Sequence, residues 1–169
     1  MLRRLVNPQV TVPANMDFLG ELRDFITRIG RLHGYPNKVI NAFRLAVDEA
    51  ATNIIRHAYR NRDGFITVKA TIKEDSLTVS FIDQGIHFNP NAAPDPDLNH
   101  YVDIGKKGGL GIFIIRKLMD EIDYRRGEEG NELTITKYCN RSYRRNFLYT
   151  LWNLSNSFKP KYLFRSIAL

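Results

Sequence analysis

Three side chains that could carry out acid–base and metal chemistry recur at four-residue intervals in one stretch of the chain. They are Glu49, Asn53 and His57, within LAVDEAATNIIRHAY (45–59). Apolar residues in and before this stretch repeat at three- and four-residue steps, which predicts an amphipathic helix facing a core. Residues four apart on a helix lie about one turn above each other. The column could hold a hydrated Mg²⁺ ion through oxygen and deprotonate a hydroxyl beside it. Alternatively, it is a solvated helix face.

Two glycine-containing segments further along could bind a ligand. Asp83-Gln84-Gly85 follows a strand-like run, so it places a carboxylate at a strand end beside a residue that lets another molecule approach the backbone. The segment GKKGGLG (105–111) directly precedes a helical run. Its backbone N–H groups and the helix dipole could therefore hold phosphate. A plain structural turn explains the first segment equally well, and a flexible hinge explains the second.

The elements that must position these residues follow from periodicity and turn formers. Strands are expected at 9–12, 65–72, 77–82, 122–126 and 133–138. Helices are expected at 18–29, with Asn15 as cap, from a cap at Asn37 to about Tyr59, and at 112–121. Residues 84–107 lack a period and contain three prolines, which predicts a lid or binding loop. This order predicts an α/β (α+β) two-layer sandwich, with a mixed, largely antiparallel sheet and helices on one face.

Length and composition indicate an ordinary globular protein. The 169 residues suffice for one domain with a real core. The single cysteine, Cys139, allows no internal disulfide and fits a reducing cytoplasm. No run approaches the roughly 20 apolar residues of a membrane-spanning helix, and the N-terminal apolar run is too short for a signal peptide. Most of the net charge of +7 lies in residues 141–169, which contain six basic residues and no acidic one. A cytoplasmic protein with a nearly neutral body and a basic tail is expected.

Four features, taken in order, resemble the boxes of the GHKL superfamily of ATPases, whose domain has the Bergerat-type ATP-binding fold. They are Glu49-x-x-x-Asn53, Asp83-x-Gly85, Gly108-Gly109-Leu110-Gly111 and Thr134. Within that superfamily, three segments are most similar to the anti-sigma factor serine/threonine kinases of bacterial partner-switching systems: DQGIHFNP (83–90), GGLGIFIIRKLMDEIDY (108–124) and NELTITK (131–137). The resemblance covers roughly residues 9–139. It implies a histidine kinase-like ATPase domain at 1–140, followed by a separate tail.

The resemblance also implies the cofactors ATP and Mg²⁺ and a role for each matching residue. Asn53 would coordinate Mg²⁺, and Glu49 would be the general base. Asp83 would accept a hydrogen bond from the adenine amino group, with Thr134 nearby, while Gly85 would let the adenine pack close. The residues expected at the phosphates are Lys106, Gly108, Gly109, Leu110 and Gly111. One position departs from the superfamily, because His87 stands where a second glycine is usual, and this leaves lid mobility and ATP affinity open.

The implied function is the phosphorylation of a STAS-type anti-sigma factor antagonist, together with sequestration of that antagonist or of a sigma factor. Two alternatives come from other classes. A module that holds ATP and a partner without phosphoryl transfer would need no base, so Glu49 beside Asn53 argues against it. A histidine kinase fragment would need an upstream phosphoacceptor histidine on a dimerisation helix, and only about 40 residues precede the nucleotide helix.

Residues 141–169 lie beyond the resemblance. Apolar and aromatic residues from Arg144 to Phe158 keep helical spacing among arginines, which predicts a basic amphipathic helix. Its aromatic face could pack on its own domain, on the second subunit of a homodimer, or on a membrane surface. Interleaved basic and aromatic residues also occur in proteins that bind single-stranded nucleic acid. No recognised module supports direct nucleic-acid binding here.

Overall fold

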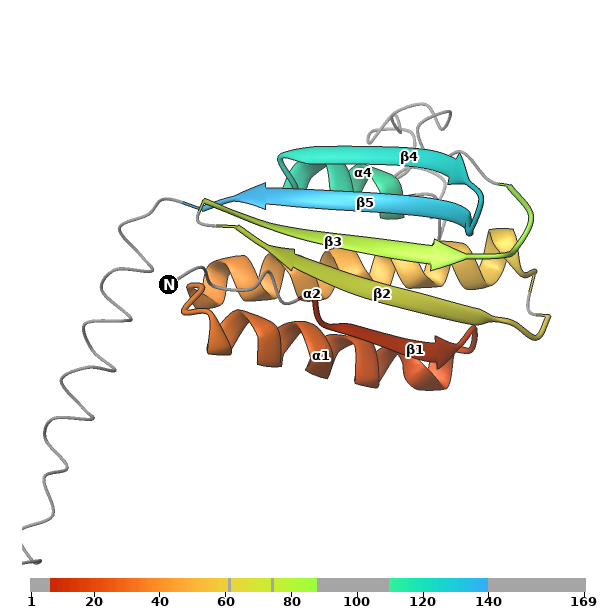
Figure 1. Cartoon of the computed structure of the whole chain (residues 1–169), viewed down its shortest axis with the longest axis horizontal. Helices are drawn as coiled ribbons and strands as arrows, with labels where there is room; N and C mark the ends of the chain where they lie inside the picture. Colours follow the sequence, from red (N-terminus) through yellow and green to blue (C-terminus); the bar gives the residue numbers. More distant parts are fainter. Residues whose placement is uncertain (1–6, 61, 74, 88–109, 140–169) are drawn as a thin grey trace, which may run out of the picture.

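A computed structural model describes residues 7–60, 62–73, 75–87 and 110–139 (Figure 1). Most of the loop expected at 84–107 and the whole tail at 141–169 lie outside these ranges. The strands are β1 (Gln9–Pro13), β2 (Phe65–Ile72), β3 (Ser76–Asp83), β4 (Glu121–Gly127) and β5 (Gly130–Tyr138). The helices are a 3₁₀ turn (Met16–Phe18), α1 (Leu19–Leu32), α2 (Asn37–Asn53), a π-helical turn (Ile54–Ala58) and α4 (Gly111–Leu118).

The strands form one sheet in the order β1-β2-β3-β5-β4. Each neighbouring pair in the described residues is antiparallel, so the expected mixed sheet has no parallel pair there. The register places Asp83, the last residue of β3, opposite Asn131 at the start of β5. It also places Tyr124 of β4 beside Leu133 of β5. The start of β5 therefore lies beside Asp83, and β4 lies one strand further along the sheet.

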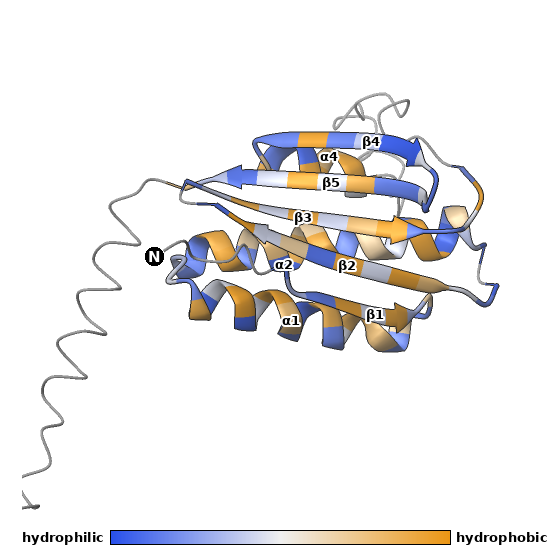
Figure 2. Ribbon diagram, in the orientation of Figure 1, coloured by the Kyte–Doolittle hydropathy of each residue, from blue (hydrophilic) through white to orange (hydrophobic). Residues whose placement is uncertain are grey.

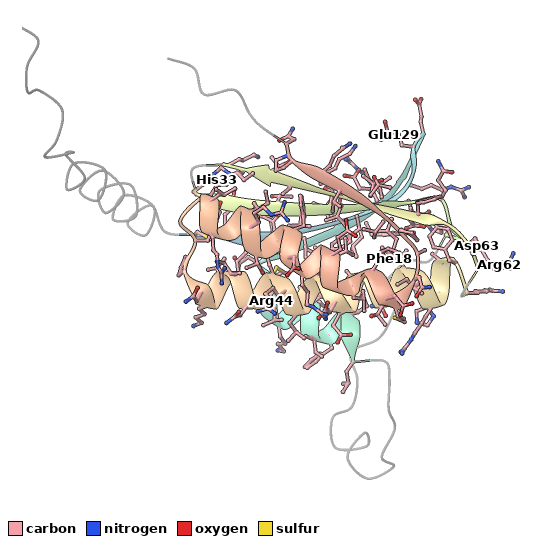
Figure 3. The ribbon with its side chains drawn as sticks, turned by 90° about the horizontal axis from the view of Figure 1, so that it is seen from below. Phe18, His33, Arg44, Arg62, Asp63 and Glu129 are labelled. Carbon is pink, nitrogen blue, oxygen red and sulfur yellow. The ribbon has the colours of Figure 1, made fainter. Side chains whose placement is uncertain are left out.

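The helices cover one face of the sheet, as the sequence predicts (Figure 3). Hydrophobic and hydrophilic residues alternate along the strands (Figure 2), and the apolar set faces the helices. The largest fully buried side chains include Leu22, Ile26, Phe43, Ile66, Phe81 and Ile135. Leu133 and Ile135 are buried on the helix side, as the alternation within β5 predicts. Within the described ranges, no helix is long and apolar enough to cross a membrane.

Two helix boundaries differ from the sequence prediction. The N-cap of α2 is Pro36 rather than Asn37, because the carbonyl of Pro36 accepts the first helical hydrogen bonds, from the N–H groups of Val39 and Ile40. The helix expected at 112–121 ends at Leu118. The N–H group of Asp120 donates to the carbonyl of Thr136 (2.9 Å), so the chain has joined the sheet by residue 120.

The central helix ends in the π-helical turn. The N–H group of Tyr59 donates to the carbonyl of Ile54, five residues earlier, at 3.0 Å. Such a wider turn shifts every following side chain relative to a regular α-helix. His57, the third member of the column predicted from Glu49 through Asn53, lies in this turn and is exposed.

Candidate active site

The N-terminus of α4 lies against two polar side chains of α2. A Cβ atom built on Gly111 would lie 2.6 Å from Oε2 of Glu49 and 3.2 Å from Nδ2 of Asn53. A larger residue would therefore displace the helix or the carboxylate. The N-cap residue Leu110 has no side-chain capping bond, and the first N–H groups of a helix have no partner within it. A helix start that can bind an anion thus meets a carboxylate and an amide.

The side chain of Asn53 fits a role as ligand to a cation. Its Nδ2 atom is buried and has no hydrogen-bond partner among the described residues. An unsatisfied buried polar group costs about 1–3 kcal/mol. The oxygen and nitrogen of an amide are exchanged by rotating its terminal torsion, so Asn53 can present its oxygen instead. Among the residues that the structure describes, no cluster of three His, Cys, Asp or Glu residues could hold a metal ion. A cation held here would have few protein ligands, which suits Mg²⁺.

Glu49 is electrostatically suited to accept a proton. Burial raises the pKa of its carboxyl above the ordinary value, the neighbouring charge of Asp48 raises it further, and Arg56 lowers it. A carboxylate with a raised pKa holds a proton more readily near neutral pH than an exposed one does. The partly buried Glu49 can therefore act as a base beside Asn53.

Asp83 is fixed at the other side of the site by two hydrogen bonds to one oxygen. Its Oδ1 accepts from the N–H of Gly85 (2.8 Å) and from Nδ2 of Asn131 (3.0 Å). Asn131 also donates to the carbonyl of Gly85 (3.1 Å). Burial raises the pKa of Asp83, and the bonds from Asn131 and Gly85 partly offset this. Both bonds use Oδ1, so Oδ2 can accept from a ligand.

A small recess lies between α2, the π-helical turn, β3, α4 and the β4–β5 hairpin. Its polar lining is Asn53 and Asp83, and Tyr124 supplies an aromatic side chain. The rest of the lining is aliphatic: Ala50, Ile54, Ala58, Ile112 and Leu133. A mostly apolar recess with a few placed polar groups is the usual form of a small-molecule site.

Among the predicted site residues that the structure describes, all but one lie together. Glu49, Asn53, Asp83, Gly85 and Gly111 lie around the recess or directly beside it. Leu110 is the N-cap of α4. The other residues expected at the phosphates, Lys106, Gly108 and Gly109, lie outside the described ranges.

The exception is Thr134, whose predicted place near Asp83 is wrong. Its hydroxyl is hydrogen-bonded to that of Ser80 (3.1 Å), and the two residues are paired across β5 and β3. Successive side chains of a strand point to opposite faces. Leu133 lines the recess, so Thr134 faces away from it. Asn131 occupies the place that the prediction gave to Thr134.

Gly85 meets the protein's own backbone. A Cβ atom at this position would lie 2.7 Å from the carbonyl carbon of Ala58. The N–H group of the next residue, Ile86, donates to the carbonyl of Ala58 (2.8 Å). The packing of this turn against the end of the π-helical turn therefore requires glycine, whatever the ligand.

Sequence reasoning missed two residues of the site, Asn131 and Tyr124. In the sequence, Asn131 stands out only as the first residue of NELTITK (131–137), and Tyr124 only as part of the strand expected at 122–126. The pairing of β3 with β5 would have identified Asn131, but it joins residues 48 positions apart, and a single sequence does not contain that register.

Comparison with known proteins relates most of the chain to one family. Residues 12–137 match the histidine kinase-like ATPase domain. Serine-protein kinase RsbW of Bacillus cereus is 30% identical over 145 residues, which cover 83% of this chain and 90% of that protein. The RsbW kinases of Staphylococcus aureus and Bacillus subtilis are each 31% identical, over 144 and 138 residues, covering 82% and 78% of this chain and 90% and 85% of those proteins.

One solved structure is similar in fold. It contains the RsbU and RsbW domains of a protein from Mycobacterium tuberculosis, and it aligns with a TM-score of 0.53 at 19% identity. The alignment covers 77% of this chain and 32% of that one. This likeness supports the fold alone.

Proposed function

Because this chain belongs to the histidine kinase-like ATPase domain family, we propose that it is a protein kinase that transfers the γ-phosphate of Mg-ATP to a serine or threonine of a partner protein. The printed names of its relatives, serine-protein kinases, support this reaction class. The observation that carries the proposal is the close approach of Gly111 to Glu49 and Asn53. It brings together a helix start suited to bind an anion, an amide suited to bind a metal ion and a carboxylate suited to act as a base.

Each group of residues at the site would have a separate role in binding or catalysis. Oδ2 of Asp83 accepts a hydrogen bond from the adenine amino group. The aliphatic side chains that line the recess exclude water from the adenine ring. Asn53 would hold Mg²⁺, which would neutralise charge on the phosphates. The N–H groups at the start of α4 bind phosphate oxygens. Glu49 accepts the proton of the attacking hydroxyl, which is otherwise a poor nucleophile at neutral pH.

The proposed partner is a STAS-domain antagonist of an anti-sigma factor, and a sigma factor is the proposed second partner. The similarity of DQGIHFNP (83–90) and NELTITK (131–137) to kinases of partner-switching systems supports this choice. The test is transfer of labelled phosphate from ATP to a STAS-domain protein encoded in the same genome, with Mg²⁺ present. A partner that binds but gains no label would indicate a holding module instead of a kinase.

Two variants separate binding from chemistry. Asn53→Ala should lose most of the Mg²⁺-dependent part of ATP affinity, as measured by calorimetry with and without Mg²⁺. Glu49→Gln keeps the size and hydrogen bonding of the side chain, so it should bind Mg-ATP nearly normally and transfer about 10²- to 10⁴-fold more slowly. If Asn53→Ala bound Mg-ATP as tightly as the wild type, the assignment of α2 to the metal would be wrong.

A further inference from the structure

A tyrosine that lines the recess is in contact with a histidine from a different segment. Tyr124 lies on β4 and lines the recess, whereas His87 follows the Asp83–Gly85 turn. The hydroxyl of Tyr124 and Nδ1 of His87 are 3.2 Å apart. Their ring centroids are 5.3 Å apart, and the ring planes are inclined by 41°. His87 is exposed and Tyr124 is half-buried.

The sheet places Tyr124 on the same side of the recess as Asp83, the residue proposed to bind adenine. Asp83 and Tyr124 point to the same face of the sheet, because Asp83 pairs with Asn131 and Tyr124 pairs with Leu133. They are two strands apart and offset by two residues. With strands about 4.8 Å apart and a rise of about 3.4 Å per residue, their Cα atoms lie about 12 Å apart. Both side chains line the recess, so a ligand held by the carboxylate of Asp83 can also contact the ring of Tyr124.

We propose that Tyr124 packs against the purine base of the bound nucleotide and that His87 is the residue that positions it. This inference rests on the proposed function, since it specifies how the same recess recognises its nucleotide. Tyr124 is the one aromatic side chain among the described lining residues, and a base stacks more favourably on an aromatic ring than on aliphatic groups. The hydrogen bond to His87 gives the half-buried hydroxyl a partner and fixes the orientation of the ring.

The first experiment compares the full-length protein with Tyr124→Leu and Tyr124→Phe. Calorimetry or NMR titration gives their affinities for ATP, ADP and adenosine. Tyr124→Leu should weaken all three ligands by the same factor, about 5- to 150-fold, because the lost contact is to the base. Tyr124→Phe keeps the ring and loses the hydroxyl that is bonded to His87, so its affinity for each ligand should fall about two- to tenfold. Tyr124 resonances should also shift on addition of adenosine.

Tyr138→Leu is the matched control. This tyrosine is exposed at the opposite end of β5, where its hydroxyl donates to Glu121 (2.7 Å), and its loss should leave all three affinities unchanged. If Tyr124→Leu bound the three ligands as tightly as the wild type, the stacking proposal would be overturned and the kinase proposal would stand. A loss confined to ATP and ADP would place the ring at the phosphates and would also overturn it. A wild type that bound no nucleotide would refute both proposals.

The second experiment tests whether His87 acts through Tyr124. His87→Ala should weaken adenosine binding by the same factor as Tyr124→Phe. In the Tyr124→Phe background it should cost nothing more, because the hydroxyl that it positions is gone. Equal losses in the two backgrounds would show that His87 acts independently and would overturn its positioning role. A loss of thermal stability without a loss of affinity would do the same.

Discussion

Gly111→Ala tests the placement of α4 over the catalytic side chains. The new methyl group would lie 2.6 Å from Oε2 of Glu49, and ordinary contact begins at 3.4 Å. The carboxylate or the helix must therefore move by about 0.8 Å, and misplacement of reacting groups by about 1 Å can cost 10²-fold in rate. Overpacking typically costs about 1–3 kcal/mol of stability, whereas alanine gains up to about 1 kcal/mol over glycine in a helix. The variant should thus stay folded and transfer phosphate about 100-fold more slowly.

The assay is the rate of transfer from labelled ATP to the partner, measured beside thermal unfolding. Gly20→Ala in α1 is the matched control, because its new methyl group would meet only Nη2 of Arg23, at 3.8 Å. This control should be as stable as the wild type or slightly more stable, and fully active. If Gly111→Ala transferred phosphate at the wild-type rate, the approach of α4 to Glu49 would have no role in the reaction.

Three further predictions concern the pKa of Glu49 and the hydrogen bonds of Asn131. The pKa of Glu49 is raised, so the transfer rate should fall as the pH is lowered through that raised value, and a pH–rate profile of wild type measures this. At a pH between the unfolded-state and folded-state pKa of Glu49, the native state binds more protons than the unfolded state does. The contribution of Glu49 to stability is therefore lost as the pH rises through this range. Glu49→Gln should for this reason raise the melting temperature at pH 7. Asn131→Ala removes both bonds that Asn131 donates to Asp83 and Gly85, and denaturant titration should show a loss of about 2 kcal/mol.

The order of elements and the helix-facing residues could be predicted from the sequence, because both follow from local periodicity. The position of Asp83 at a strand end could also be predicted, since the strand-like run before it ends at a turn. The partner of Asp83 could not be found in this way. Thr134 and Asn131 lie in the same short segment, and only the register of β5 against β3 decides which of them faces the recess. A shift of one residue exchanges the two faces of a strand, so a position within a strand is less certain than the strand itself.

The end of the central helix fixes the position of Asn53 relative to the turn that contains Asp83 and Gly85. Asn53 is the last residue of α2, and the π-helical turn that follows brings the carbonyl of Ala58 to the N–H group of Ile86. The helix that carries the proposed metal ligand is therefore bonded directly to the turn that orients Asp83. Gly85 makes this contact close enough, since any Cβ there would overlap Ala58. A glycine in a nucleotide-site motif can thus be required by contacts between protein elements. Gly85→Ala should then lower stability even without nucleotide, as thermal unfolding of the ligand-free protein would measure, and an unchanged melting temperature would instead favour a role limited to the base.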